Sequence, residues 1–232
     1  MNNNQEQINI ETKSTKSTTL YDETFSHSYA QTFSTFKPFV TISGIIGSGK
    51  STLTKKLGEL MGFESFYEPV DNNPYLPLFY KDMKRYGFTM QVFLLNERYR
   101  QHQEAMWSRK PVVQDRSIYE DRIFAKMLNE SGNISDIDFE TYRRLSDNMS
   151  SSIRQPNLII YLDCEPEIAL ERVKIRSRDC ETTIPIEYLR DLRDGYEDWL
   201  KGVEKHIPVL RLDWNEYQDT IVVAKKIREM LK

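Results

Sequence analysis

The segment from Gly44 to Ser51 constrains this chain more than any other part of the sequence. It reads Gly-Ile-Ile-Gly-Ser-Gly-Lys-Ser and fits the phosphate-loop pattern G-x-x-x-x-G-K-[ST], in which glycines let backbone N–H groups turn around a phosphate. The apolar run 39–42 precedes it and a helical pattern follows from Ser51, which is the strand, loop and helix context that the pattern requires. A plain glycine-rich turn is the alternative. The segment predicts that the chain binds a nucleoside triphosphate.

The first 37 residues differ from the remainder of this 232-residue chain. They are rich in Asn, Ser and Thr, contain neither Gly nor Arg, and show no sustained helical or strand period. Such a composition buries too little apolar surface to fold, so we expect a disordered or loosely ordered tail over residues 1–37 and a single domain over residues 38–232. A mitochondrial transit peptide is the alternative, but such peptides are poor in acids, whereas this tail carries Glu6, Glu11, Asp22 and Glu23.

Net charge and cysteine content limit which kinds of binding partner and which cell compartment are expected. A formal charge of −3 gives no basic excess, so neither nucleic acid nor an anionic membrane is expected as the main partner, and the substrate should be a small molecule. Cys164 and Cys180 are the only cysteines and lack Cys-x-x-Cys spacing, which argues against a zinc site and a disulfide framework. We therefore expect a reducing compartment, the cytoplasm, with the mitochondrion as the alternative. The sequence contains no run of 18 apolar residues, so we expect no membrane-spanning helix.

Hydrophobic patterning predicts the fold class. Leu158–Leu162 is apolar throughout, as a parallel strand buried on both faces should be. The other expected strands are 39–42, 63–67, 112–114 and 209–212. Helical patterns alternate with these strands over 51–61, about 88–107, 118–128, 136–153, from 166 onward, 184–199 and 217–231. Gly62 follows the first of these helices, as a C-cap residue would. Strands that alternate with helices predict an α/β fold with a five-stranded parallel sheet flanked by helices on both faces.

Polar side chains follow two of these strands. Glu68 stands at the end of the second strand, before Pro69, and Asp115-Arg116-Ser117 ends the third. Because ligands of parallel sheets bind at the carboxyl ends of the strands, these acids and this arginine are well placed for chemistry. For Glu68, a solvated loop acid is an equally open alternative.

Two polar side chains share one face of the 88–107 helix. Gln91 and Arg98 lie seven residues apart, or two helical turns, with Leu94 and Leu95 between them. A glutamine and an arginine on an otherwise apolar stripe could bind a polar ligand. They could also be ordinary surface residues on the outer side of the helix.

A run of cations follows the strand at 158–162. Arg172, Lys174, Arg176 and Arg178 place four positive charges within seven positions. A solvated charged face is one interpretation. In a chain that has a phosphate loop, clustered arginines can also close over a triphosphate as a lid.

Together these motifs resemble those of the deoxyribonucleoside kinase family, from Phe39 to the C-terminus. The resemblance implies a P-loop kinase fold with an arginine-rich lid, ATP and Mg²⁺ as cofactors, and a homodimer. It implies phosphorylation of the 5′-hydroxyl of a purine deoxyribonucleoside in nucleotide salvage, with deoxyadenosine as the first expectation. Deoxyguanosine and deoxycytidine kinases of the same family are alternatives, as is a thymidylate-kinase-like nucleoside monophosphate kinase. The motifs that carry the resemblance are the phosphate loop, Tyr67-Glu68-Pro69-Val70, Gln91 with Arg98, Asp115-Arg116-Ser117 with Asp121, and Arg176-Ser-Arg178 with Glu181 and Ile184-Pro185.

The resemblance also assigns roles to individual residues. Glu68 corresponds to the carboxylate that accepts the 5′-hydroxyl proton, Arg116 to the arginine that holds it, and Asp115 to the acid beside the metal or, alternatively, the proton acceptor. Ser51 and Asp115 are the implied metal ligands. The implied ATP-binding residues are Gly44, Ile45, Ile46, Gly47, Ser48, Gly49, Lys50, Ser51, Thr52, Arg172, Arg176, Arg178 and Asp213.

A second set of residues is implied to bind the nucleoside. Tyr80 and Glu181 match the pair that grips the sugar 3′-hydroxyl, and Glu68 with Arg116 would meet the 5′ end. Gln91, Arg98 and Asp121 match the groups that read the base edge, and Phe124 matches the ring that stacks on the base. Here the sequence departs from the family, because Asp121-Arg122 and Phe124 are separated by one residue where relatives often have two.

Overall fold

The structure, a computed structural model, describes residues 37–68, 73–176 and 184–232. Within these residues five strands form one parallel sheet in the order β2-β3-β1-β4-β5. The strand before the phosphate loop is therefore central. The predicted α/β fold with a five-stranded parallel sheet is confirmed. The strands are β1 (Phe39–Ser43), β2 (Glu64–Phe66), β3 (Val112–Asp115), β4 (Leu158–Asp163) and β5 (Val209–Asp213).

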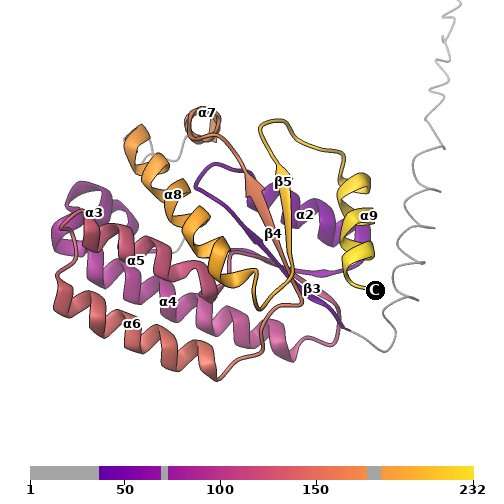
Figure 1. The fold of residues 1–232 in the computed structure, drawn as a ribbon, viewed down its shortest axis with the longest axis horizontal. Helices are drawn as coiled ribbons and strands as arrows, with labels where there is room; N and C mark the ends of the chain where they lie inside the picture. Colours follow the sequence, from indigo (N-terminus) through magenta and orange to yellow (C-terminus); the bar gives the residue numbers. More distant parts are fainter. Residues whose placement is uncertain (1–36, 69–72, 177–183) are drawn as a thin grey trace, which may run out of the picture.

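Helices cover both faces of the sheet, as Figure 1 shows. One face carries α2 (Lys50–Met61) and α9 (Thr220–Met230). The other carries α4 (Met83–Trp107), α5 (Asp121–Glu130) and α8 (Ile186–Val203), with α6 (Asp136–Ser151) packed outside α4 and α5. The remaining elements are α3 (Leu76–Lys81), the 3₁₀ turn η1 (Ile118–Glu120) and α7 (Pro166–Arg176).

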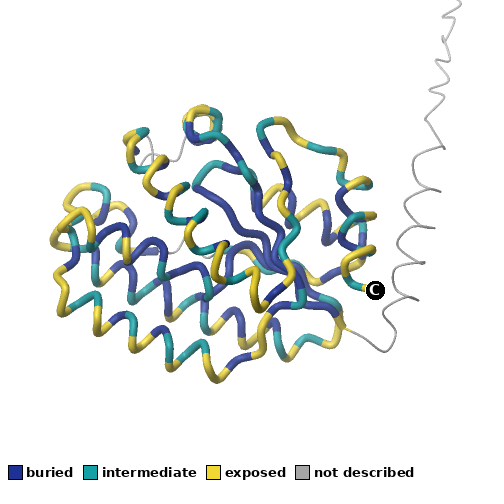
Figure 2. Tube along the Cα trace, in the orientation of Figure 1, coloured by how far each residue is buried: buried dark blue, intermediate teal, exposed yellow. Residues whose placement is uncertain are grey.

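The core lies along the sheet, where the strands form the dark band of Figure 2 and the outer faces of the helices are exposed. Leu158–Leu162 of β4 is almost fully buried because helices cover both of its faces. With both faces closed, the loops at the carboxyl ends of the strands are the part of the sheet that is open to a ligand.

Helix α4 is longer than its sequence pattern predicted. It begins at Met83, where the Asp82 side chain accepts a hydrogen bond from the Arg85 backbone N–H at 3.0 Å, and not near residue 88. Gly87 suggested the later start, but it lies inside the helix. A glycine is needed there because the helix packs closely on a neighbouring loop: a Cβ at this position would lie 3.1 Å from the Asn133 carbonyl oxygen. Packing against the loop between α5 and α6 therefore outweighs the low helix propensity of glycine.

Other helix boundaries also differ from the prediction, and two of them have a clear local cause. Helix α9 begins at Thr220 and not at residue 217, because the Asp219 carboxylate accepts the backbone N–H of Ile221 at 2.8 Å and caps the helix there. The helix expected from residue 118 starts with the 3₁₀ turn η1, where the Glu120 carboxylate accepts the backbone N–H of Ser117 at 3.0 Å. No helix in the described part of the chain is long and apolar enough to cross a membrane.

Candidate active site

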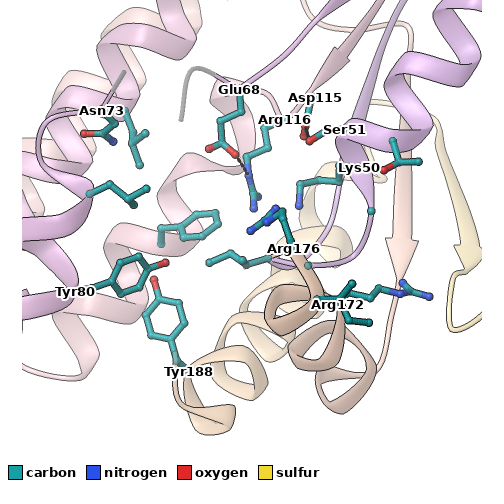
Figure 3. A pocket seen from close by; sticks show the side chains of 18 of the residues that line it. Lys50, Ser51, Glu68, Asn73, Tyr80, Asp115, Arg116, Arg172, Arg176 and Tyr188 are labelled. Carbon is teal, nitrogen blue, oxygen red and sulfur yellow. Dashed lines mark hydrogen bonds and ion pairs between the residues drawn. The ribbon is translucent and has the colours of Figure 1, made fainter. Parts of the chain in front are cut away.

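A cavity of about 740 Å³ opens at the carboxyl ends of β1, β2 and β3 and joins the phosphate loop to α4. Figure 3 shows its lining, with Ser51 and Asp115 on one side and Tyr80 and Tyr188 across from them. The cavity collects residues that are far apart in the sequence. The predicted site residues that line it are Ile46, Gly47, Gly49, Lys50, Ser51, Thr52, Glu68, Tyr80, Gln91, Arg98, Asp115, Arg116, Phe124, Arg172 and Arg176.

Glycines let the phosphate loop take its shape. Gly47 has φ 83°, and a Cβ there would lie 2.3 Å from the Ala169 carbonyl oxygen, so no side chain fits. Gly49, with φ 95°, precedes α2 and directs the loop into the helix N-terminus. The loop therefore presents backbone N–H groups at the positive end of a helix, which is a site for phosphate.

Lys50 lies inside this loop. Its Nζ donates to the carbonyl oxygens of Gly44 at 3.0 Å and Ile45 at 2.7 Å, and the side chain is buried. The pKa of Lys50 is lowered to about 7: burial is the main cause, the neighbouring Arg116 adds to the shift, and Asp115 and Glu68 oppose it. A negatively charged ligand in the loop would favour the ammonium form.

Ser51 and Asp115 fit a magnesium site. The Ser51 hydroxyl donates to Asp115 Oδ2 at 2.5 Å, while the buried Oδ1 has no hydrogen-bond partner among the described residues. Burial raises the pKa of Asp115, so the carboxylate would gain from a nearby cation. Mg²⁺ prefers such hard oxygen ligands and usually takes one or two from the protein and others from substrate phosphates. These two residues could therefore hold Mg²⁺ beside the phosphate loop.

Glu68 is held between two arginines. Arg116 Nε donates to its Oε2 at 3.0 Å, and Arg98 Nη2 donates to Oε1. Burial alone would raise the pKa of Glu68, but Arg116 and Arg98, with Lys50, outweigh it and hold this pKa well below its usual range. The carboxyl is thus ionised, and its side chain is only 16% exposed. The alternative of a solvated loop acid is wrong.

Arg116 adopts an uncommon backbone conformation. Its φ of 65° is the only positive value at a non-glycine residue in the described ranges, and its N–H donates to the Ile42 carbonyl at 2.9 Å. The buried guanidinium stacks over the Phe124 ring at 4.9 Å. Strained residues of this kind cluster at functional sites.

The far end of the cavity combines apolar walls with buried polar groups. Gln91 and Arg98 are each 2% exposed, so the alternative of ordinary surface residues is wrong. Arg98 Nη1 pairs with the fully buried Asp121, behind the cavity wall, and Gln91 Oε1 has no hydrogen-bond partner in the part of the chain that the structure describes. The apolar walls here are Leu76, Phe79, Met90, Leu94 and Phe124. An uncharged ring with a polar edge suits such a pocket.

Some predicted residues lie elsewhere. Asp213 is exposed and does not line the cavity, and its carboxylate accepts the backbone N–H of Asn215 at 3.1 Å. Gly44, Ile45 and Ser48 belong to the phosphate loop but do not line the cavity. Arg178 and Glu181 fall outside the described residues.

Arg172 and Arg176 reach the cavity from α7. Arg172 donates to the carbonyl oxygens of Ser48 at 3.3 Å and Asn215 at 2.8 Å, and it stacks over the Tyr217 ring at 4.3 Å. It therefore ties α7 to the phosphate loop and to the segment after β5. The lid role stays a prediction.

Sequence reasoning missed several lining residues. Asn73 and Tyr188 line the apolar end of the cavity, and Asn215 and Tyr217 line the phosphate-loop end. None of them belongs to a motif, and only the fold brings them near the predicted residues. For Tyr217, the predicted helix start at that position concealed its place in a loop.

Comparison with known proteins identifies the family. A model of the family described as deoxynucleoside kinase matches residues 40–232, which is most of the chain. The chain belongs to the deoxynucleoside kinase family. The resemblance found in the sequence is thereby confirmed, and the chain is a kinase with a P-loop kinase fold.

Individual relatives agree with this assignment. The chain is 47% identical over 189 residues to the deoxyadenosine kinase of Dictyostelium discoideum, covering 82% of this chain and 77% of the relative. It is 38% identical over 197 residues to the deoxyguanosine kinase of the same organism, covering 83% and 69%. The structure of deoxyadenosine kinase from M. mycoides with bound dATP superimposes with a TM-score of 0.75 at 30% identity, covering 82% and 98%.

The lowered pKa of Lys50 predicts that this deoxynucleoside kinase takes up protons when ATP binds. Near pH 8 a lysine with a pKa of about 7 is mostly neutral, and the triphosphate charge should restore the ammonium form. Uptake should rise between pH 6 and pH 8 toward about one proton per site. Calorimetric titration with ATP in two buffers of different ionisation enthalpy measures it. Lys50→Arg, which is always charged, should show no such uptake, and equal uptake by both proteins would contradict the prediction.

Proposed function

We propose that this kinase transfers the γ-phosphate of ATP to the 5′-hydroxyl of deoxyadenosine. The observation that carries the proposal is one continuous cavity that runs from the phosphate loop, past the ionised Glu68, to the apolar pocket with Gln91 and Arg98. The phosphate-loop end would bind a triphosphate and the apolar end would bind a nucleoside, with Glu68 between them. The deoxyadenosine kinases among the relatives support this substrate, and the deoxyguanosine kinase supports deoxyguanosine as the second choice.

The residues between the two ends fit an in-line transfer. Glu68 accepts the proton of the 5′-hydroxyl, the oxygen attacks the γ-phosphorus, and the bond from that phosphorus to the β–γ bridging oxygen breaks to release ADP. Arg116 fixes the orientation of Glu68, and Lys50 offsets charge on the transferred group. Ser51 and Asp115 would hold Mg²⁺, which neutralises phosphate charge when bound.

The polar edge of the pocket suits adenine. The amide of Gln91 can accept a hydrogen bond from the amino group of adenine and donate one to a ring nitrogen. Its buried Oε1 has no hydrogen-bond partner in the described residues, which leaves it available to a ligand. Arg98, fixed by Asp121, adds a donor beside it.

A nucleoside monophosphate kinase is disfavoured by charge. In such an enzyme the acceptor carries a phosphate, which would lie near Glu68. Because Arg116 and Arg98 keep the pKa of Glu68 low, the carboxylate would repel that phosphate.

The kinase should be tested with ATP and Mg²⁺ against a panel of the four deoxynucleosides, the ribonucleosides and dTMP. Deoxyadenosine should give the highest kcat/KM and deoxyguanosine the second highest, because the pocket pairs with a purine edge. Removing Mg²⁺ with EDTA should abolish turnover. Turnover of dTMP alone would refute the proposal.

Glu68→Gln should lower kcat by roughly a hundredfold or more, since the amide cannot accept the proton, with little change in deoxyadenosine affinity. Steady-state kinetics and nucleoside binding measure the two effects. Glu64→Gln alters an exposed acid on β2, the strand that precedes Glu68, and should leave turnover unchanged. Full activity of Glu68→Gln would remove Glu68 from the mechanism.

We also propose that the protein is a homodimer. We propose the cytoplasm as its compartment, on the basis of the cysteine content alone. A groove between α5 and α8 is lined by Arg122, Lys126 and Glu130 on the α5 side, where Lys126 pairs with Glu130, and by Asp191, Asp194 and Asp198 on the α8 side. A two-fold axis would bring the basic side of each copy onto the acidic side of the other. Light scattering after size exclusion should give twice the mass of one chain, and Lys126→Glu should lower it. A monomeric mass for the wild type at all concentrations would refute the dimer.

A further inference from the structure

Arg116 receives a contact from the side away from the cavity. Its Nη1 donates to the hydroxyl oxygen of Tyr196, on α8, at 2.6 Å and to the Gly44 carbonyl at 3.2 Å. Tyr196 is fully buried and is absent from the residues that line the cavity in the described ranges. The Nη1 end of the guanidinium is thus anchored inside the protein, while Nε faces Glu68.

A buried carboxylate fixes the Tyr196 hydroxyl in turn. The hydroxyl donates to Glu120 Oε2 at 2.8 Å, and Glu120 Oε1 accepts the backbone N–H of Ser117 at 3.0 Å. Since the hydroxyl proton is committed to Glu120, the oxygen is left to accept from Arg116. Glu120 Oε1 also lies 4.0 Å from Arg116 Nη1, which adds attraction between the charges.

The same groups support the left-handed backbone at Arg116. An L-residue keeps a positive φ only where its surroundings hold it there. The Ile42 carbonyl binds the N–H of Arg116, and Glu120 binds the N–H of the next residue, Ser117. Glu120 therefore supports the turn, and Tyr196 supports the side chain that the turn directs.

We propose that Tyr196 and Glu120 are positioning residues that hold Arg116 in the orientation that presents its Nε to Glu68. The inference rests on the proposed function of Glu68 as the proton acceptor. Without the Tyr196 hydroxyl, the Nη1 end keeps the Gly44 carbonyl as its hydrogen-bond acceptor and only the more distant Glu120 charge beside it, so it can turn toward the triphosphate. Glu68 then loses its fixed geometry relative to the 5′-hydroxyl.

The ring of Tyr196 has a separate, structural role. It packs against Phe124, Tyr161 and Trp199, with centroids 6.4, 5.7 and 6.0 Å away. Tyr196→Phe keeps this ring and removes only the hydroxyl. Tyr142→Phe is the matched control, because Tyr142 is also fully buried and its hydroxyl has no hydrogen-bond partner among the residues described.

Tyr196→Phe should lower kcat for deoxyadenosine by about 10- to 100-fold, the effect of a small misplacement at a reacting centre, while KM for ATP changes less than about twofold. Tyr142→Phe should keep the kcat of the wild type.

In the Glu68→Gln background, Tyr196→Phe should cause little further loss, because both changes act through the same proton acceptor, which is already lost. A purely structural role would instead give losses that multiply. If Tyr196→Phe does not fold, Glu120→Gln, which keeps an oxygen for Ser117, should show the same split between kcat and KM.

The outcomes separate the two proposals. A wild-type protein that does not phosphorylate deoxyadenosine refutes the proposed function itself. Suppose that the wild type is active, that Glu68→Gln has a lowered kcat, and that Tyr196→Phe has the same kcat as Tyr142→Phe. That result overturns only the positioning role. Losses that multiply in the double variant overturn it as well.

Discussion

The ion pair between Glu68 and Arg116 is the contact on which the site depends. It joins the ends of β2 and β3, two neighbouring strands, across 48 residues of sequence. Burying either charge alone would cost several kcal/mol, so each needs the other and further hydrogen bonds around it. Arg116 obtains them from Gly44 and Tyr196, and Glu68 obtains them from Arg98. The ion pair thereby ties the phosphate loop, α4 and α8 to one carboxylate.

The strand order explains why these groups meet. β1 lies at the centre, with β3 on one side and β4 on the other, so the phosphate loop emerges between connections that leave in opposite directions. Open parallel sheets bind their ligands in the crevice that forms at such a point. Asp115 stands at the end of β3, directly across from Ile42 of β1, and this register puts its carboxylate within reach of Ser51.

Arg98 links the two ends of the cavity. It pairs with Asp121 behind the apolar end of the cavity and with Glu68 nearer the phosphate loop, and it is almost fully buried between them. A change in one partner therefore alters the electrostatic environment of the other. In the proposed reaction, base recognition and orientation of the proton acceptor share a single guanidinium.

The sequence alone determined the features that depend on neighbouring residues. The phosphate loop, the buried strand at Leu158–Leu162 and the αL cap at Gly62 follow from local patterns, and the structure confirms each of them. Tertiary structure decided the helix start at Met83, the exposure of Asp213, and the burial of Gln91. It also decided the contact from Tyr196 to Arg116 across 80 residues. Such features result from packing between elements, and no local spacing encodes which side chain will fill the space behind another.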